Sequence, residues 1–485
     1  MKLKHGFKFS KNGWIYIHIE GKPYQRGFAH GKLLKKEIHD FSKSIFWEQY
    51  DSTGMSEALL LKLSNFYFKN IIESDYPEYM EQLRGISEGA DISLDKIIFL
   101  NNIASFSSAL ISLEEYKDQI PNLTESEYEL ISETSGSSSI KEGGARDRCT
   151  AFIAIGDYTH DGKIYCGHNI FDSFVSGQYF NIIIDEKPDN GNRFLYQAAP
   201  GYISSQGDFY VNSKGFIVTE TTIGGFNKYK KLHPIGCRIR KCIQYANTLE
   251  DYEDVLKNNN SGDYANSWLI GDTKNNEIMR IELGLKYVNV ERKKNGYFIG
   301  FNSAYDPRIR NLECINTGYD DIRRHQGARK VRLEQLMEKH KGKIDIEISK
   351  AILADHYDVY LNKINLSSRT CCSHYELDDR AFMSQADRPL PFQPRGALDG
   401  CVSSSELANK MTLDARWGTS CGTPFIVDDF LSKHIQWKRF RPYLKDRPSQ
   451  PWTQFHSIDK NPQETRSNKK ISNKKIFKKK SVKKY

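Results

Sequence analysis

The fold is decided around the stretch Arg146-Asp-Arg-Cys149-Thr-Ala-Phe-Ile-Ala-Ile-Gly156. A Ser- and Gly-rich segment, 135–144, precedes it, and the alternation typical of a β-strand begins at Cys149. After a turn, a second predicted strand ends in His168 and Asn169. A nucleophile at the first residue of a strand, behind a linker, is what an enzyme needs if its own chain amine is to serve as the base. We therefore take cleavage directly before Cys149 as the working hypothesis.

The periodicity of the apolar residues changes at this stretch. Before it, residues 13–20 predict one strand, and apolar positions three or four residues apart predict amphipathic helices. After it, alternating segments joined by Gly, Asp and Asn turns predict strands, with helices near 237–247, 249–257, 319–340 and 345–359. Strands in blocks and helices in blocks predict an α+β fold rather than a regularly alternating parallel sheet. We expect four parts in the chain: an N-terminal strand and helical region, 1–133; a linker, 134–148; a catalytic core, 149–455; and a basic, disordered tail, 456–485.

The charge of the chain is unevenly distributed. Its 70 Lys and Arg residues exceed its 61 Asp and Glu residues by nine, but ten of the basic residues lie in 466–485, which has no acidic residue. The rest of the chain therefore carries 60 basic residues against 61 acidic ones. A Lys-, Asn- and Ser-rich tail cannot bury enough apolar surface to fold, so it is either simply solvated or in peripheral contact with an anionic membrane or polyanion. The nearly neutral body predicts no dedicated nucleic-acid site.

The apolar runs and the cysteines bear on the compartment and on metal binding. There is no run of about 18 apolar residues, and the basic start of the chain leads into no apolar segment, so we expect neither a transmembrane helix nor a signal peptide. A cytoplasmic location is therefore favoured over a secreted or lysosomal one. Nine irregularly spaced cysteines favour reduced thiols. Because Cys371-Cys372 with His374, and Cys237 with Cys242, lack the spacing of common metal sites, we expect no metal and no other cofactor.

Cys149 is the strongest candidate for a nucleophile. It follows a charged Arg-Asp-Arg segment, and the small residues Thr150 and Ala151 after it leave room for a substrate. Cleavage between Arg148 and Cys149 would free an α-amine that titrates close to neutral pH. That amine can take the proton of its own thiol and return it to a leaving group. Cys166, inside a predicted strand, is better explained by core packing.

Five segments have a recognisable order and spacing. They are Cys149-Thr-Ala with its strand; Gly167-His-Asn-Ile-Phe171; Pro200-Gly-Tyr-Ile-Ser-Ser-Gln-Gly-Asp208-Phe-Tyr210, continuing through Gly215 to Glu220-Thr-Thr-Ile-Gly224; Asn260-Ser-Gly-Asp-Tyr-Ala-Asn266-Ser-Trp268; and Arg26-Gly-Phe-Ala-His-Gly31. The first four resemble the phospholipase B-like family of N-terminal-nucleophile hydrolases. The fifth is similar to the amino-terminal motif of related acyltransferases that process acyl-coenzyme A and penicillin precursors. The resemblance spans about residues 13–455.

This resemblance implies both an architecture and a reaction. It implies a four-layer αββα sandwich, self-cleavage between Arg148 and Cys149, and hydrolysis of a carboxylic ester or linear amide in a lipid or N-acyl substrate. Cys149 would be the nucleophile and, through its amine, the base. Asn266 would donate to the developing oxyanion, an interaction worth about 3 kcal/mol of barrier lowering. Asn169 would orient the thiol or the amine.

The resemblance also implies residues that bind substrate. His168 and Phe171 match pocket positions near the nucleophile. The family has an arginine late in the sheet region, for which Arg308 is our candidate and Arg310 the alternative.

Two other functions stay open. An acyltransferase would use the same acyl-enzyme and differ in whether water or an amine reaches the thioester. A catalytically inactive scaffold would use its basic tail to bind a membrane or polyanion.

Overall fold

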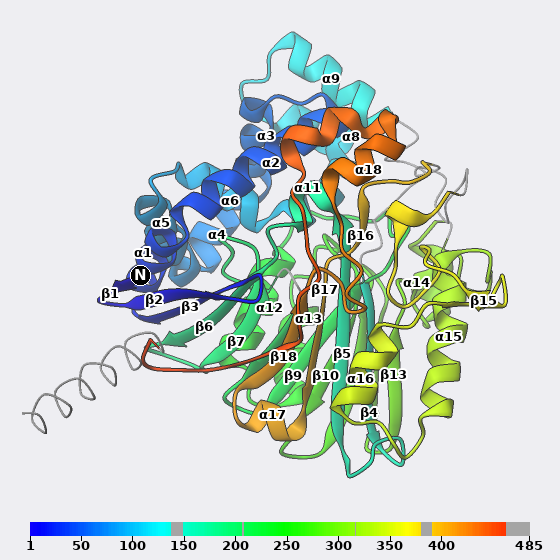
Figure 1. Cartoon of the computed structure of the whole chain (residues 1–485). Coiled ribbons are helices and arrows are strands. Elements are labelled where there is room, and N and C mark those ends of the chain that lie inside the picture. Colours follow the sequence, from blue (N-terminus) through cyan, green and yellow to red (C-terminus); the bar gives the residue numbers. More distant parts are fainter. Residues whose placement is uncertain (137–148, 206–207, 316, 380–389, 462–485) are drawn as a thin grey trace, which may run out of the picture.

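The structure is a computed structural model that describes residues 1–136, 149–205, 208–315, 317–379 and 390–461. The predicted basic tail beyond 461 and most of the predicted linker, 137–148, lie outside these residues. The described chain combines helices with two large β-sheets (Figure 1), which confirms a mixed α and β fold.

The first sheet has ten strands and includes the N-terminus of the chain. Its strand order is β1-β2-β3-β6-β7-β8-β9-β10-β11-β12. The pair β3–β6 is parallel, and the other pairs are antiparallel. The strands are β1 (Lys2–Leu3), β2 (Gly6–Lys11), β3 (Trp14–Gly21), β6 (Ile182–Pro188), β7 (Phe194–Ala198), β8 (Phe209–Asn212), β9 (Phe216–Thr222), β10 (Asn266–Asp272), β11 (Glu277–Leu283) and β12 (Val288–Lys293). The predicted N-terminal strand thus belongs to the same hydrogen-bonded sheet as strands that follow Cys149 in the chain.

The second sheet has seven strands, and Cys149 begins one of its inner strands. Its order is β13-β4-β5-β17-β18-β19, with β16 also paired to β5. The strands are β4 (Cys149–Gly156), β5 (Gly162–Ser173), β13 (Gly296–Gly300), β16 (Arg395–Ala397), β17 (Asp399–Ser404), β18 (Thr412–Trp417) and β19 (Thr453–His456). A separate pair joins β14 (Tyr357–Asp358) to β15 (Lys363–Ile364). Because β4 has partners on both sides, the backbone after Cys149 is held firmly.

The two sheets pack against each other at close range. Strands β4 and β5 contact β9 and β10. A Cβ added to Gly271 would lie 3.0 Å from side-chain atoms of Ile153 and Ile164, and one added to Gly300 would lie 2.5 Å from Thr221. Since helices cover the opposite face of the second sheet, β4 is buried on both faces. That explains why it reads as an almost continuous apolar run.

Helices lie on the outer faces of both sheets. Figure 1 shows α15 (His325–Lys339) and α16 (Ile346–Leu353) beside the strands of the second sheet. These helices contribute Leu333, Leu336 and Leu353 to a buried core with Phe152. On the first sheet, the Tyr210 hydroxyl donates to the Tyr252 hydroxyl at 2.9 Å. Tyr252 belongs to α13 (Leu249–Lys257), which packs beside α12 (Ile235–Tyr245).

The segment Arg26–Gly31 lies in a tightly packed helix pair. It belongs to α1 (Pro23–Leu33), which crosses α5 (Pro77–Ala90) so closely that a Cβ on Gly27 would lie 2.0 Å from the Gln82 carbonyl oxygen. Arg26 is fully buried and donates to Glu186 at 2.9 Å. Burial alone would raise the pKa of Glu186, but Arg240 and Arg26 outweigh it and lower that pKa to about 2. The segment therefore joins the N-terminal helices to the first sheet.

The remaining α-helices range in length from the 19 residues of α2 to the four of α8 and α11. They are α2 (Lys35–Thr53), α3 (Glu57–Ser64), α4 (Asn70–Asp75), α6 (Leu94–Asn101), α7 (Ile103–Ala109), α8 (Leu113–Tyr116), α9 (Glu125–Gly136), α11 (Phe174–Gly177), α14 (Pro307–Leu312), α17 (Ser405–Asn409) and α18 (Val427–Lys433). No single helix among the described residues is long and apolar enough to cross a membrane; one bent pair, 94–101 with 103–119, meets that criterion only jointly.

Candidate active site around Cys149

Cys149 lies where three chemically active side chains converge. It is fully buried at the start of β4, opposite Ile170 of β5, while Ala151 pairs with His168. Because side chains alternate along strands, Cys149 and His168 share the face that packs toward the first sheet. The Cys149 sulfur, a ring nitrogen of His168 and a carboxylate oxygen of Asp208 all lie within 4.8 Å of one another. The distance from Cys149 Sγ to Asp208 Oδ2 is 4.0 Å.

Asp208 follows a segment, 199–205, that the N-terminal helices hold. It directly precedes β8 and has a φ of 55°, a left-handed conformation that Asp adopts more readily than most residues. In the preceding loop, the Gly201 amide donates to His30 Nε2 at 3.0 Å, and Asn101 Nδ2 donates to the Gly201 oxygen at 2.8 Å. Burial lowers the pKa of His30 to about 4, so the ring is neutral at pH 7 and can accept this bond. The helical region thus helps to build the site.

His168 is neutral as well as buried. Its side chain is fully enclosed, and burial lowers its pKa to about 3, with the nearby Glu220 backbone opposing that shift. Among the described residues, neither ring nitrogen has a hydrogen-bond partner that meets ordinary geometry. A neutral imidazole can donate or accept one hydrogen bond at each nitrogen. His168 can therefore position a thiol or a substrate, but it carries no charge at pH 7.

The backbone nitrogen of Cys149 is bound by Asn302. Cys149 N donates to Asn302 Oδ1 at 3.3 Å, and Asn302 Nδ2 donates to the Thr222 oxygen at 2.8 Å. Asn302 follows β13 and has a φ of 66°, which again suits asparagine. Its amide therefore links the start of β4 to the end of β9. The nitrogen that would become the chain amine is already oriented.

Arg329 is the cation of this site. It lies on the buried face of α15 with Leu333, and it is fully enclosed. Its guanidinium donates to the Cys149 oxygen at 2.6 Å, to Thr150 Oγ1 at 3.0 Å and to Asn302 Oδ1 at 2.7 Å. The planar guanidinium of Arg329 therefore positions both Cys149, which supplies the thiol, and Asn302, which accepts a hydrogen bond from the Cys149 nitrogen.

Asn266 is connected to Cys149 through two residues, Thr222 and Asn302. It begins β10 opposite Thr222, whose carbonyl oxygen accepts from Asn302. Asn266 Nδ2 donates to Glu220 Oε2 at 2.5 Å, and both side chains are fully buried. Asn266 and Glu220 share one face of the first sheet, because they lie diagonally across paired strands.

Asn169 and Phe171 lie on the opposite face of β5 from His168. Asn169 Nδ2 donates to the backbone oxygens of Leu353 at 2.8 Å and Cys371 at 3.2 Å. Phe171 is fully buried on the same outer face, with the Arg329 guanidinium 5.3 Å from its ring. The strand period of two therefore separates Asn169 and Phe171 from the thiol, whereas the family resemblance implied positions near it.

The late arginine that reaches Cys149 is Arg329 rather than the proposed Arg308. The Arg308 side chain is 54% exposed and forms an ion pair with Asp306 at 2.6 Å. Arg310 donates to the backbone oxygens of Ala304 and Tyr305. A sequence signal for Arg329 did exist, since it lies four residues before Leu333 on the apolar face of a predicted helix.

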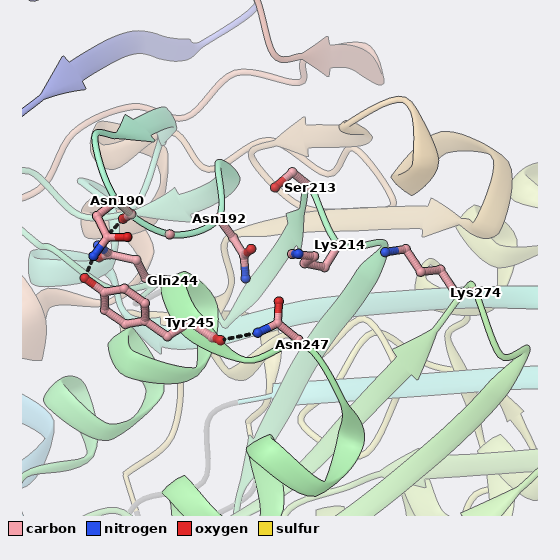
Figure 2. A pocket seen from close by; sticks show the side chains of 9 residues that line it. Asn190, Asn192, Ser213, Lys214, Gln244, Tyr245, Asn247 and Lys274 are labelled. Atoms are coloured by element: carbon pink, nitrogen blue, oxygen red, sulfur yellow. Dashed lines mark hydrogen bonds between the residues drawn. The ribbon is translucent and has the colours of Figure 1, made fainter.

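A separate surface pocket lies at the other end of β10 from Asn266. It has a volume of about 620 Å³ and is open to solvent. Figure 2 shows the side chains that line it. Its lining is polar and consists of Asn190, Gly191, Asn192, Ser213, Lys214, Gln244, Tyr245, Asn247 and Lys274. This lining contains no cysteine, histidine or carboxylate, so the pocket lacks the groups that converge at Cys149.

Comparisons with known proteins place this site in context. A family model described as Phospholipase B matches residues 10–443. An uncharacterized protein of Archaeoglobus fulgidus is 26% identical over 276 residues, covering 55% of this chain and 42% of that protein. Phospholipase B of Crotalus adamanteus is 25% identical over 282 residues, covering 52% and 48%. Putative phospholipase B-like 2 of Mus musculus is 32% identical over 143 residues, covering 26% and 24%. The chain spans less than half the length of these relatives.

Proposed function

Because this chain belongs to the phospholipase B family, we propose that it hydrolyses the acyl bond of a carboxylic ester or linear amide, in a lipid or N-acyl substrate, with the Cys149 thiol as nucleophile. The observation that carries the proposal is the convergence of the Cys149 sulfur with His168 and Asp208, beside a backbone nitrogen already bound by Asn302. A thiol, a polar partner and an oriented nitrogen are the parts that thiol-dependent acyl transfer requires. No metal is assigned a role in this reaction.

We propose that the two packed sheets and their outer helices form the αββα sandwich of N-terminal-nucleophile hydrolases. Maturation would then begin with attack of Cys149 Sγ on the carbonyl carbon of Arg148. The amide nitrogen of Cys149 leaves as an amine and takes the thiol proton, and a thioester joins Arg148 to the sulfur. Water hydrolyses this thioester, which frees both the thiol and the amine. The Cys149 N–H bond to Asn302 supports this step because it orients the leaving nitrogen.

In turnover, the freed amine of Cys149 acts as the base. It accepts the thiol proton as the sulfur attacks the substrate carbonyl, and it returns that proton to the leaving alcohol or amine. Water then hydrolyses the thioester. The guanidinium of Arg329, hydrogen-bonded to the oxygen of the same residue, disfavours a second positive charge on the amine. That effect keeps the amine available as a base near neutral pH.

Asn266 is our proposed oxyanion donor. A side-chain amide has two N–H bonds, and Glu220 accepts one of them. This contact orients the amide, and the other N–H is the proposed donor to the substrate oxygen. A single donor of this kind lowers the barrier by about 3 kcal/mol. His168, being neutral, serves as a hydrogen-bond partner for thiol or substrate rather than as a cation.

The test compares Cys149→Ala with a matched cysteine variant, Cys314→Ser. Cys314 is a half-buried thiol that lies outside this site. Hydrolysis of acyl esters, N-acyl amides and phospholipid vesicles is measured with and without an added primary amine. We expect Cys149→Ala to lose all turnover and Cys314→Ser to retain it. Product transferred to the amine would identify an acyltransferase, and undiminished hydrolysis by Cys149→Ala would overturn the assignment.

A further inference from the structure

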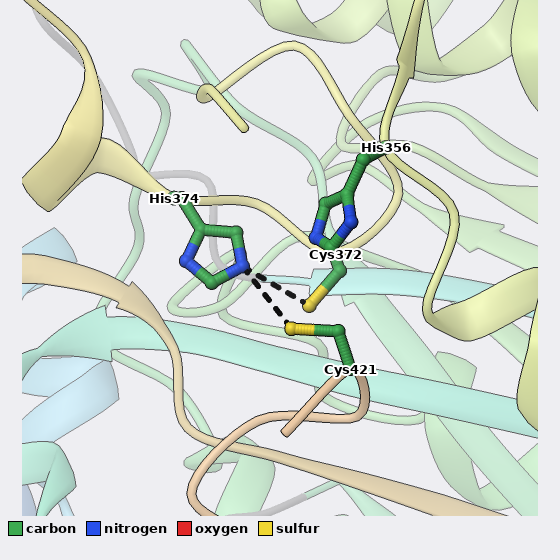
Figure 3. A group of neighbouring side chains, drawn as sticks. All are labelled: His356, Cys372, His374 and Cys421. Atoms are coloured by element: carbon green, nitrogen blue, oxygen red, sulfur yellow. Dashed lines mark hydrogen bonds between the residues drawn. The ribbon is translucent and has the colours of Figure 1, made fainter. Parts of the chain in front are cut away.

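Four metal-ligating side chains meet on the outer face of the second sheet. His356 follows α16, Cys372 and His374 lie in the loop before 375–377, and Cys421 lies in the loop after β18 (Figure 3). One donor atom from each lies within 4.8 Å of the others. His374 Nε2 is 3.5 Å from the sulfur of Cys372 and 3.5 Å from the sulfur of Cys421. Three segments far apart in sequence therefore bring two thiols and two imidazoles to one point.

These spacings fit a tetrahedral metal site. Zinc binds cysteine sulfur at about 2.3 Å and histidine nitrogen at about 2.0–2.1 Å, so neighbouring S and N ligands of a tetrahedron lie about 3.6 Å apart. The two measured N–S distances of 3.5 Å agree with that value. Tetrahedral sites with two sulfur and two nitrogen donors favour zinc over magnesium, calcium or manganese. We propose that His356, Cys372, His374 and Cys421 bind one zinc ion.

The surroundings of the four side chains support this assignment. His374 Nδ1 lies 2.8 Å from Glu376 Oε1, the carboxylate–histidine arrangement that orients histidine ligands of zinc. Gly396 permits this contact, since a Cβ there would lie 2.6 Å from Glu376 Oε2. The sulfur of Cys421 accepts from the Thr423 amide at 3.4 Å. An outer shell that fixes the ligands is what a genuine site requires.

A thiol-based active site is the main competing interpretation of this cluster. Cys421, His374 and Glu376 alone have the order of a nucleophile, a base and an orienting carboxylate. A catalytic triad of this kind consists of one thiol, one imidazole and one carboxylate, so it does not account for a second thiol and a second imidazole at the same point. The fully buried Cys372 sulfur, also 3.5 Å from His374 Nε2, and the adjacent His356 ring therefore favour a metal.

The proposed zinc site is structural. All four tetrahedral positions are filled by protein donors, which leaves no position for a reacting water. The site joins the segment 355–379 to the loop 418–423, behind the strand that carries His168. Asn169 donates to the Cys371 oxygen, and Phe171 packs against Cys372. Zinc would therefore stabilise the outer face of β5, the strand whose inner face carries His168. The inference does not depend on the proposed hydrolase function.

The spacing of the ligands explains why the sequence predicted no metal. Cys372 and His374 are two residues apart, which matches no common zinc signature. Their partners lie 16 residues before Cys372 and 49 residues after it, and they become visible as partners only in the folded chain.

The experiment measures zinc directly in the full chain. Protein is purified under reducing conditions, incubated with zinc sulfate, freed of unbound metal and analysed by elemental mass spectrometry. The variants are Cys421→Ser, its matched control Cys314→Ser, and Glu376→Gln. We expect one zinc per chain in wild type and Cys314→Ser, and loss of zinc from Cys421→Ser. Glu376→Gln keeps all four ligands, so we expect it to bind one zinc with affinity lowered by about 10- to 100-fold in a chelator competition.

Two results would overturn the proposal. One is only trace zinc in folded wild-type protein after incubation with the metal. The other is a disulfide between Cys372 and Cys421 in freshly prepared protein, detected by peptide mass spectrometry. Because Glu376→Gln removes no ligand, an affinity equal to that of wild type would contradict the assigned outer shell even if Cys421→Ser failed to fold. Replacement of zinc by cobalt should give the intense visible absorption of tetrahedral Co²⁺, and weak octahedral bands would contradict the geometry.

Discussion

Replacing His168 by Gln tests the burial of the candidate site through its pH dependence. In the unfolded chain a histidine has a pKa near 6.5, whereas in the folded protein burial lowers the pKa of His168 to about 3. Between these values the unfolded chain binds more protons than the folded protein. The contribution of His168 to stability is therefore complete above pH 6.5 and is lost as the pH falls toward 3.

The size of the effect follows from these two pKa values. At pH 4.5 an unfolded histidine is about 99% protonated, while the folded His168 is still neutral. The free energy of unfolding of the wild type should then be lower than at pH 7.5 by about 3 kcal/mol from this residue alone. Other titrating groups, including His30, act equally in wild type and variant, so they cancel in the comparison.

The assay is urea unfolding followed by tryptophan fluorescence at pH 7.5 and pH 4.5. His168→Gln should lose about 3 kcal/mol less than the wild type between the two pH values, whatever its stability at pH 7.5. His160→Gln is the matched control, because the His160 side chain is 49% exposed, and it should behave like the wild type. If His168→Gln and the wild type lost the same free energy within about 0.5 kcal/mol, His168 would not be buried in a neutral state.

Two further substitutions test other parts of the structure. Arg329→Lys keeps the positive charge but loses the planar fork that holds both Cys149 and Asn302, so we expect self-cleavage and turnover to fall by about 100-fold; rates within a few-fold of wild type would contradict its positioning role. Gly27→Ala places a Cβ 2.0 Å from the Gln82 oxygen and should lower the free energy of unfolding by about 3 kcal/mol, as measured in urea. Gly236→Ala, whose nearest non-neighbouring atom is 3.3 Å away, should change it by less than about 1 kcal/mol, and equal effects of the two would refute the close helix crossing.

Strand positions were largely readable from the sequence because they depend on local alternation and turns. Residues 13–20 were predicted as a strand, and they form most of β3. The pairing of β3 with β6 was not readable, because it joins residues more than 160 positions apart. Contacts such as Arg26 with Glu186 fix that pairing, and no local pattern encodes them.

The site was only partly predictable for the same physical reason. Cys149 and His168 were singled out, and the fold brings them together. The family resemblance implied that Asn169 would act with them, but alternation along β5 points its side chain to the opposite face. Asn302 and Arg329 reach Cys149 from a strand end and a helix more than 150 residues away. Only the buried arginine on an apolar helix face left a local signal.

The most direct test of the account is the N-terminus of the mature protein. Intact-mass analysis and N-terminal sequencing of purified, active protein should find two chains, the second beginning Cys149-Thr-Ala. Cys149→Ala should stay as one uncut chain without activity. A fully active protein with an intact Arg148–Cys149 bond, or with cleavage at another position, would contradict the claim that Cys149 is both the nucleophile and the source of the base.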